Sequence, residues 1–221
     1  MTCINLPCPS AGGTDETLDG GDKWVRVVSR RHEPEVVVFA NFLSAPECDA
    51  LIQMAQTRLS RSLTVDTHTG NEAVHPDRTS QGMFFERFEN EVVCCVETRI
   101  AKILHWPVKH GEGLQVLHYT KGAQYLPHHD YFDPRETGTP ALLARGGQRV
   151  ATLIIYLNTP GSGGATVFPD LGLQIKPMRG QAVFFSYAEP LPTSLTLHGG
   201  EPVTSGEKWI ATKWLRQHEF A

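Results

Sequence analysis

The chain has 221 residues, of which 40% are hydrophobic and 20% charged, and its formal net charge is -4 at pH 7. This length fits one globular domain, and the scattered basic residues give no reason to expect a nucleic-acid partner. No stretch approaches the length of a membrane span, and residues 1–22 contain neither a basic segment nor a continuous apolar one, so we expect no membrane association and no secretory signal. The five cysteines are odd in number and form no CxxC pair, which indicates a reducing, cytoplasmic location.

The N-terminal part of the chain differs in composition from the remainder of the sequence. Residues 1–22 are rich in Gly, Ser, Thr, Asp and Pro and show little apolar periodicity. We therefore expect a flexible N-terminal arm there and a single domain over residues 23–221. The run from Val36 to Phe42 is apolar and β-branched, which predicts the first strand of that domain.

Two helices are predicted in the first half of the chain. Ser44 and Glu47 have the spacing of a capping box, so a helix is expected to begin here. A second helix is expected from about Glu86 to His105, because apolar residues recur at helical spacing and Pro107 comes directly after it. We expect the two helices to cover one outer face of the fold.

From Gly113 onward, short apolar runs alternate with turns that contain Gly and Pro. The predicted strands are Leu114–Tyr119, Arg149–Leu157, Ala165–Phe168, Leu173–Lys176, Gln181–Tyr187, Ser194–His198 and Lys208–Leu215. Many short strands with regular punctuation indicate a mainly β fold, in the form of a double-sheet β-sandwich such as a jelly roll.

A group of histidines and an aspartate lies in the segment QYLPHHDYFD, residues 124–133. If this segment is a strand, His128 and Asp130 point to the same side and His129 points to the other. One imidazole and one carboxylate on the same side can bind one metal ion. A second histidine would complete the two-histidine, one-carboxylate arrangement typical of non-haem Fe(II) oxygenases, which leaves adjacent coordination positions open for reactants.

The second histidine must come from a distant strand, and the chain has ten histidines. We favour His198, because it ends a strand-like run and precedes Lys208, whose side chain could reach the far carboxylate of a 2-oxo acid. His105, His110 and His118 all precede the H-x-D tripeptide and are weaker candidates. Each feature is unspecific by itself, and composition and periodicity do not identify the cosubstrate.

Seven stretches resemble, in the same order, the prolyl 4-hydroxylase catalytic-domain family. They are VFANFLSAPECDALI, DRTSQGMFF, LQVLHYTKGAQYLPHHDYFD, GGQRVATLIIYLN, GGATVFP, PMRGQAVFFS and GEKWIATKW, and the similarity extends from about Glu35 to Arg216. The resemblance implies a mainly β fold with flanking α-helices around a double-stranded β-helix (jelly-roll, cupin-like) core. It also implies a dioxygenase that uses Fe(II), 2-oxoglutarate and dioxygen, with ascorbate as reductant.

The resemblance also assigns roles to individual residues of this chain. The residues that match iron ligands are His128, Asp130 and His198, and those that match the 2-oxoglutarate site are Lys208, Tyr119 and Thr166. The residues that match the substrate groove are Arg78, Ser80, Glu112, Arg149, Trp214 and Arg216. The polar segments 62–80 and 133–147 resemble two mobile segments that close over the site.

The implied reaction is C4 hydroxylation of prolyl residues in a peptide or protein, with conversion of 2-oxoglutarate to succinate. The alternatives are the same chemistry on free proline, another amino acid or a small metabolite, and an inactive metal-binding interaction module. A zinc hydrolase would need a general base that the sequence does not supply. Two positions depart from the family pattern: Glu201 replaces a common Cys, and Arg216 replaces a common His, which leaves the peptide preference open. We expect a monomer or a homodimer.

Overall fold

The computed structural model describes residues 6–9, 16–65, 72–73 and 77–221. Its strands are Thr17–Asp19 (β1), Trp24–His32 (β2), Glu35–Ala40 (β3), Ser60–Arg61 (β4), Thr64–Val65 (β5), Glu72–Ala73 (β6), Gln81–Phe85 (β7), Leu114–Tyr119 (β8), Tyr125–His128 (β9), Arg149–Tyr156 (β10), Ser162–Gly163 (β11), Thr166–Phe168 (β12), Leu173–Ile175 (β13), Ala182–Ser186 (β14), His198–Gly200 (β15), Val203–Ser205 (β16) and Lys208–Arg216 (β17). Its α-helices are Ala45–Gln56 (α1), Glu91–Leu104 (α2) and Thr139–Leu143 (α3), and short 3-10 helices lie at Val108–His110, Pro169–Leu171 and Pro192–Ser194.

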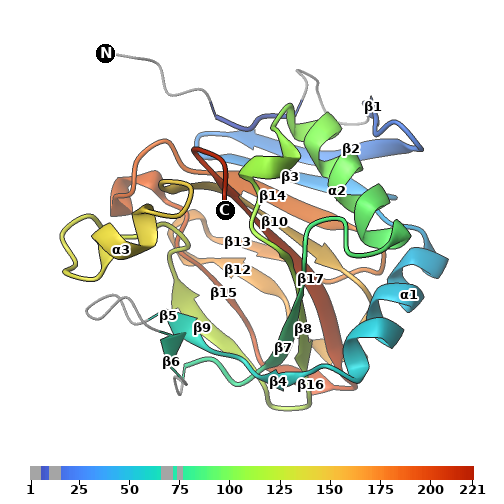
Figure 1. The fold of residues 1–221 in the computed structure, drawn as a ribbon. Helices are drawn as coiled ribbons and strands as arrows, with labels where there is room; N and C mark the ends of the chain where they lie inside the picture. Colours follow the sequence, from blue (N-terminus) through green and yellow to red (C-terminus); the bar gives the residue numbers. More distant parts are fainter. Residues whose placement is uncertain (1–5, 10–15, 66–71, 74–76) are drawn as a thin grey trace.

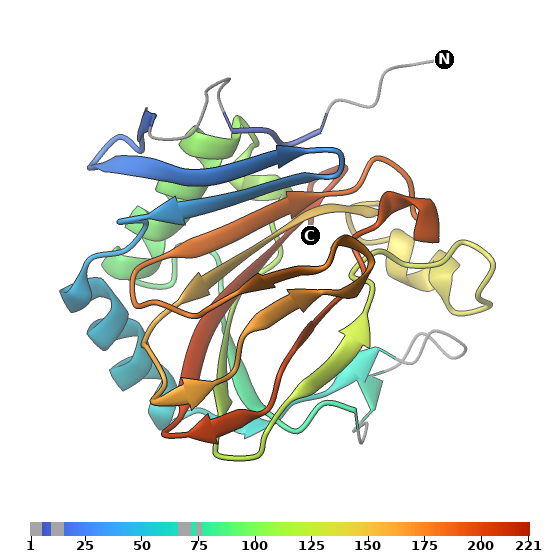
Figure 2. The ribbon, with the colours of Figure 1, turned by 180° about the vertical axis from the view of Figure 1, so that it is seen from behind.

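Two antiparallel sheets form the body of the molecule. The larger has nine strands in the order β1-β2-β3-β14-β10-β17-β8-β7-β4, and the smaller has four in the order β13-β12-β15-β9. The helices α1 and α2 lie on one side of the large sheet (Figure 1). The view from behind in Figure 2 shows the small sheet on the other side. This is the double-stranded β-helix core with flanking helices that the sequence predicts.

The large sheet is buried on both faces, which explains why its central strands are almost continuously apolar. On one face, side chains such as Leu51 and Ile100 of the helices join the core around Leu153. On the other face, Tyr156 of β10 and Phe168 of β12 pack between the two sheets, and both are fully buried. The small sheet is thereby held in a fixed position against the large one, and it carries the histidines of the predicted site.

The two helices begin where side chains cap them. The predicted capping box is present at α1: the Ser44 N–H donates to Glu47 Oε2 at 2.7 Å, and the Glu47 N–H donates to Ser44 Oγ at 3.4 Å. The second helix begins at Glu91 rather than at Glu86. Asn90 caps it by accepting from the Val93 N–H at 3.0 Å, and Phe88 has a left-handed φ of 59°, which a continuous helix cannot include.

The N-terminal boundary also differs from the prediction. Residues 17–19 of the expected flexible arm form β1, which pairs with β2, and Leu18 is buried in the core. The strand β2 was not predicted, because its apolar residues end at Val28 and its second half, residues 29–32, is entirely polar. Other parts of the expected arm, residues 1–5 and 10–15, lie outside the described residues.

Three further segments differ in detail from the prediction. The predicted strand Ser194–His198 is displaced to His198–Gly200, because Pro192–Ser194 forms a 3-10 helix. The segment 133–147, which resembles one of the family's mobile segments and shows no apolar period, contains α3, and in segment 62–80 the described part includes β5 and β6. Residues 66–71 and 74–76 of that segment lie outside the described part.

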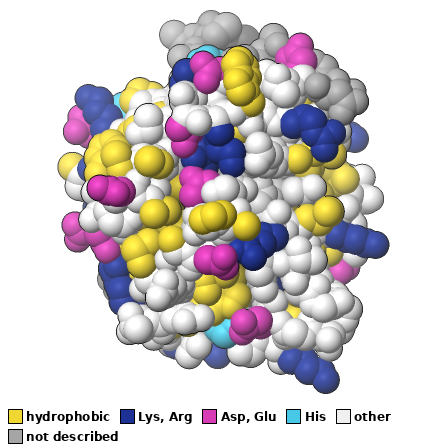
Figure 3. Space-filling model, turned by 90° about the vertical axis from the view of Figure 1, so that its right-hand side faces the viewer, with side chains coloured by type: hydrophobic (Ala, Val, Ile, Leu, Met, Phe, Trp, Pro, Cys, Tyr) yellow, Lys and Arg dark blue, Asp and Glu magenta, His cyan; other side chains and the backbone are white. Residues whose placement is uncertain are grey.

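The surface shows no concentration of one charge over the helix-bearing side. On the side of the molecule where α1 lies, Lys and Arg side chains are interspersed with Asp, Glu and apolar side chains (Figure 3). None of the helices in the described part of the chain has the length and apolar character that a bilayer crossing requires.

Candidate metal centre and active site

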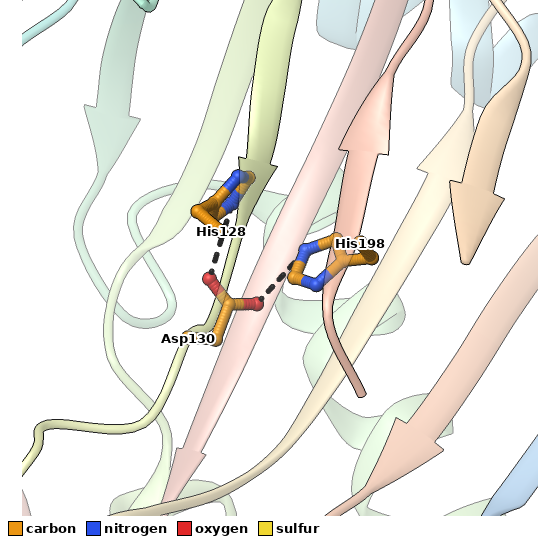
Figure 4. Close-up of side chains that lie close together, drawn as sticks. All are labelled: His128, Asp130 and His198. Atoms are coloured by element: carbon orange, nitrogen blue, oxygen red, sulfur yellow. Dashed lines mark ion pairs between the residues drawn. The ribbon is translucent and has the colours of Figure 1, made fainter. Parts of the chain in front are cut away.

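Three side chains from the small sheet meet at one point. His128 ends β9, His198 begins β15, and the two residues are register partners in the ladder between these strands. His128 Nε2 lies 3.7 Å from Asp130 Oδ1, and His198 Nε2 lies 3.5 Å from Asp130 Oδ2. Figure 4 shows both imidazoles turned toward the carboxylate. Asp130 lies in a bend after β9, so this bend, rather than strand alternation alone, brings it beside His128.

Backbone carbonyls orient both imidazoles. His128 Nδ1 lies 2.9 Å from the Leu126 carbonyl oxygen, and His198 Nδ1 lies 3.1 Å from that of Thr196. Each Nδ1–H can therefore donate to a carbonyl, which leaves the Nε2 lone pair directed toward Asp130. Burial and the neighbouring His198 lower the pKa of His128 to about 3, so this imidazole is neutral at physiological pH, as a metal ligand must be.

Asp130 is held as a carboxylate. Burial acts to raise the pKa of Asp130, but His198, His128 and Arg149 outweigh it and lower the value to about 2. Thr152 Oγ1 donates to Asp130 Oδ2 at 2.7 Å and lies 3.1 Å from the Tyr187 hydroxyl. Two imidazoles and one carboxylate, all with ligand atoms within 4.8 Å of one another, form a donor set that fits Fe(II).

Replacing Thr152 by valine should weaken metal binding about 10-fold, because the carboxylate loses the hydroxyl that orients it while the side-chain shape is kept. The metal dissociation constant, measured by titration with Fe(II) under anaerobic conditions, checks this. Thr152→Ser keeps the hydroxyl and should restore most of the affinity. Equal affinities in the valine and serine variants would show that the hydroxyl has no such role.

A small pocket adjoins the metal triad and contains the predicted 2-oxoglutarate residues. Tyr119, Thr166 and Lys208 line it together with the three candidate ligands. The Lys208 side chain is buried, and no ion-pair partner for its ammonium is found among the described residues. Burial lowers the pKa of Lys208 to about 8, partly opposed by Glu201. A buried ammonium without an ion-pair partner can bind an anionic ligand group that enters the pocket.

A groove of about 450 Å³ leads to the same triad. Four of the six predicted substrate residues line it: Arg78, Glu112, Arg149 and Trp214. Glu112 accepts from Arg149 Nε at 2.6 Å, and the carboxylate keeps the pKa of Arg149 above its usual value although burial opposes this. The Arg149 guanidinium lies 4.1 Å from the centre of a Trp214 ring.

The other two predicted substrate residues lie behind the groove wall. Ser80 is fully buried and its hydroxyl donates to Ser62 Oγ at 2.9 Å. Arg216 is also buried: its Nε lies 2.9 Å from Glu112 Oε1, and its Nη1 donates to the Gly147 carbonyl. Both are therefore placed to support groove residues rather than to contact a ligand directly.

Several residues of the site were not predicted. Thr152 and Tyr187 belong to runs that the sequence marks only as buried strands. The Tyr125 ring stacks on His128 with centroids 3.6 Å apart, and the Arg78 guanidinium lies 5.0 Å from the centre of that same ring. This stacking fixes the orientation of the His128 ring. The only feature of the sequence that could have predicted it is the position of Tyr125 close to the H-x-D tripeptide. His129 stacks on Tyr131 and is outside the candidate ligand set, as expected.

Comparisons with known proteins identify the family. Residues 114–216 match the model of the 2OG-Fe(II) oxygenase superfamily. Prolyl 4-hydroxylase 5 of Arabidopsis thaliana is 41% identical, over 100% of this chain and 80% of that protein. Probable prolyl 4-hydroxylase 3 of the same plant is 40% identical, over 90% of this chain and 75% of that protein.

Solved structures agree with the fold. The viral collagen prolyl hydroxylase of Paramecium Bursaria Chlorella virus-1, in complex with 2-oxoglutarate, matches with a TM-score of 0.63 and 33% identity over 82% of this chain and 95% of that one. A prolyl-4-hydroxylase of Pseudomonas putida, at 20% identity and a TM-score of 0.54 over 82% of this chain and 91% of that one, shares the fold. The chain belongs to the prolyl 4-hydroxylase family of Fe(II)- and 2-oxoglutarate-dependent oxygenases. It is a 2-oxoglutarate-dependent dioxygenase.

Proposed function

We propose that this protein hydroxylates prolyl residues at C4 in a peptide or protein, while 2-oxoglutarate is converted to succinate and carbon dioxide. The observation that carries the proposal is the position of the His128, Asp130 and His198 triad, between a groove and the pocket of Lys208. The choice of a prolyl substrate is supported by the relatives, which include prolyl 4-hydroxylases at about 40% identity.

Different residues around the triad would bind the metal ion and the cosubstrate. His128, Asp130 and His198 would hold Fe(II), and the Lys208 ammonium would bind the distal carboxylate of 2-oxoglutarate. The hydroxyls of Tyr119 and Thr166 line the same pocket; the Tyr156 hydroxyl donates to Thr166 Oγ1 at 2.8 Å and orients it. Bound iron would activate dioxygen, which is the oxidant, and 2-oxoglutarate would supply two electrons as it is decarboxylated to succinate. The buried walls of the pocket exclude water from that chemistry.

The groove favours a peptide over a free amino acid. It extends from the metal triad past Trp214 and Phe84 to β4, so it offers surface well beyond the position of one reacting residue. Arg149, Arg78, Glu112 and Trp214 would contact the substrate, and Arg216 and Ser80 would support them from behind. The same chemistry on free proline or a small metabolite would leave most of this surface unused.

Ascorbate as reductant and a cytoplasmic location are further parts of the proposal. The location is supported by the described cysteines, Cys8, Cys48, Cys94 and Cys95, all of which are free thiols. We propose no nucleic-acid partner and a monomer or homodimer.

Mass spectrometry of a panel of peptides and free amino acids, incubated with Fe(II), 2-oxoglutarate and the protein, tests the proposed function. We expect one added oxygen on proline within peptides, with one succinate formed per hydroxylation. Oxygen added only to free proline or to a non-prolyl compound would instead select the alternative substrate. Succinate without any oxygenated product across the panel would reject prolyl hydroxylation.

A further inference from the structure

The groove carries positive charge in a chain whose overall charge is negative. Four arginines line it, Arg58, Arg61, Arg78 and Arg149, whereas its carboxylates are Glu112 and Asp130. The formal net charge of the chain is -4. The groove leads to the reaction centre, and its charge is opposite in sign to that of the whole protein. A positive groove of this kind indicates a negatively charged ligand.

Part of this positive charge is neutralised within the protein. Arg58 forms an ion pair with Glu89, and Arg149 forms one with Glu112. However, Arg216 Nε also lies 2.9 Å from the Glu112 carboxylate, so two guanidiniums share one carboxylate and one positive charge is left over. Asp130 offers no compensation, because it belongs to the metal triad.

Arg78 is a buried cation without an anionic partner among the described residues. It is 5% exposed, and it lines both the groove and the Lys208 pocket. Its Nη1 donates to the Leu63 carbonyl and its Nη2 to Gln115 Oε1, each at 2.9 Å, and Nε has no hydrogen-bond partner among the described residues. A buried guanidinium held only by neutral acceptors is costly unless an anion approaches it.

Arg61 is the exposed counterpart at the groove rim. It lies on β4, where it pairs in register with Gln81 of β7, and no ion pair with another described residue is found for it. Because it is exposed and no described carboxylate compensates its charge, it can contact a side chain of a bound peptide at a distance from the reacting proline. A guanidinium prefers a carboxylate, which it can bind through two parallel hydrogen bonds.

We infer that the preferred substrate is an acidic peptide, with an Asp or Glu close to the target proline that Arg61 binds, in a groove kept positive by Arg78 and the Arg149–Arg216 pair. This inference rests on the proposed function and narrows its substrate class. Arg61 is a specificity-determining residue in this view, because it selects among prolyl peptides without contacting the reacting atoms.

A matched set of peptides tests the inference. Each peptide contains one proline and carries Glu, Gln or Lys at a single position, which is varied over the four residues before and the four residues after the proline. The KM and kcat for hydroxylation are measured for every peptide. Fluorescence anisotropy gives the dissociation constant of each peptide. For at least one position we expect the KM of the Glu peptide to be about fivefold lower than that of the Gln peptide. At the same position the KM of the Lys peptide should be higher than that of the Gln peptide. The advantage of Glu should decline as ionic strength rises.

Two variants and a control assign the preference to Arg61. In Arg61→Gln the KM values of the Glu and Gln peptides should become nearly equal. In Arg61→Glu the Lys peptide should have the lowest KM. Arg31→Gln removes an exposed arginine of β2, near the opposite edge of the large sheet, and should keep the wild-type ratio. Equal KM and equal dissociation constants for Glu, Gln and Lys peptides would overturn the inference while hydroxylation itself stands. An acidic preference that persists in Arg61→Gln would overturn the role of Arg61. Failure to bind or hydroxylate any peptide would reject the proposed function and the inference together.

Discussion

Replacing His198 by alanine is expected to abolish turnover and to weaken Fe(II) binding by more than about 100-fold, since even residues that only orient metal ligands contribute roughly 10- to 100-fold. His198 supplies one of the two imidazoles of the triad, and its Nε2 lies 3.5 Å from Asp130 Oδ2. Succinate formation and anaerobic metal titration measure the two effects. The fold should persist, because His198 lies in β15, a strand of only three residues.

The adjacent histidine in the sequence provides a matched control for metal binding. His129 has the same side chain and lies between two candidate ligands, but its ring stacks on Tyr131 and it is outside the ligand set. His129→Ala should therefore keep the Fe(II) affinity of the wild-type protein. Full succinate production by His198→Ala, or loss of metal in both variants alike, would contradict the assignment of His198.

Replacing Lys208 by methionine should raise the KM for 2-oxoglutarate on the order of 100-fold, because loss of one partner of a buried charge pair costs roughly 2–5 kcal/mol. The same variant should unfold at a higher temperature in the absence of ligand, since it removes a buried ammonium that has no ion-pair partner among the described residues. Lys121→Met, at an exposed position, is the control and should leave both values unchanged. An unchanged KM in Lys208→Met would remove this lysine from cosubstrate binding.

The pH dependence of the KM for 2-oxoglutarate reports on the same side chain. Burial lowers the pKa of Lys208 to about 8 in the ligand-free protein, and the proposed contact needs the protonated ammonium. Above a pH of about 8 the free protein loses this proton, so the KM should rise by up to about tenfold per pH unit, whereas at lower pH it should be flat. Lys208→Arg keeps its charge, and the rise should be absent. A wild-type KM that stays constant well into the alkaline range would contradict this dependence.

Local sequence determined the elements that depend on near neighbours. The capping box of Ser44 and Glu47 located the start of α1, and the uninterrupted apolar runs located β8, β10, β14 and β17, because both signals arise from residues close together in the chain. The start of α2 was placed too early, since the apolar period continues upstream of the Asn90 cap. The strand β2 was missed, because its apolar alternation stops at Val28 and its second half is polar.

The sequence by itself also identified the chemistry of the site: an H-x-D tripeptide, a later histidine and a lysine, in an order that resembles one oxygenase family. The tertiary structure decided which groups support them. Thr152 of β10, in the large sheet, reaches Asp130, which follows β9 of the small sheet. Arg216 of β17 reaches Glu112, which lies just before β8, the neighbour of β17 in the large sheet. Ser80 and Arg216 lie behind the groove wall, and Arg61 and Arg78 line the groove without a carboxylate partner in the described part of the chain. Such relations depend on which strands lie side by side and on where water is excluded, and these follow only from long-range packing.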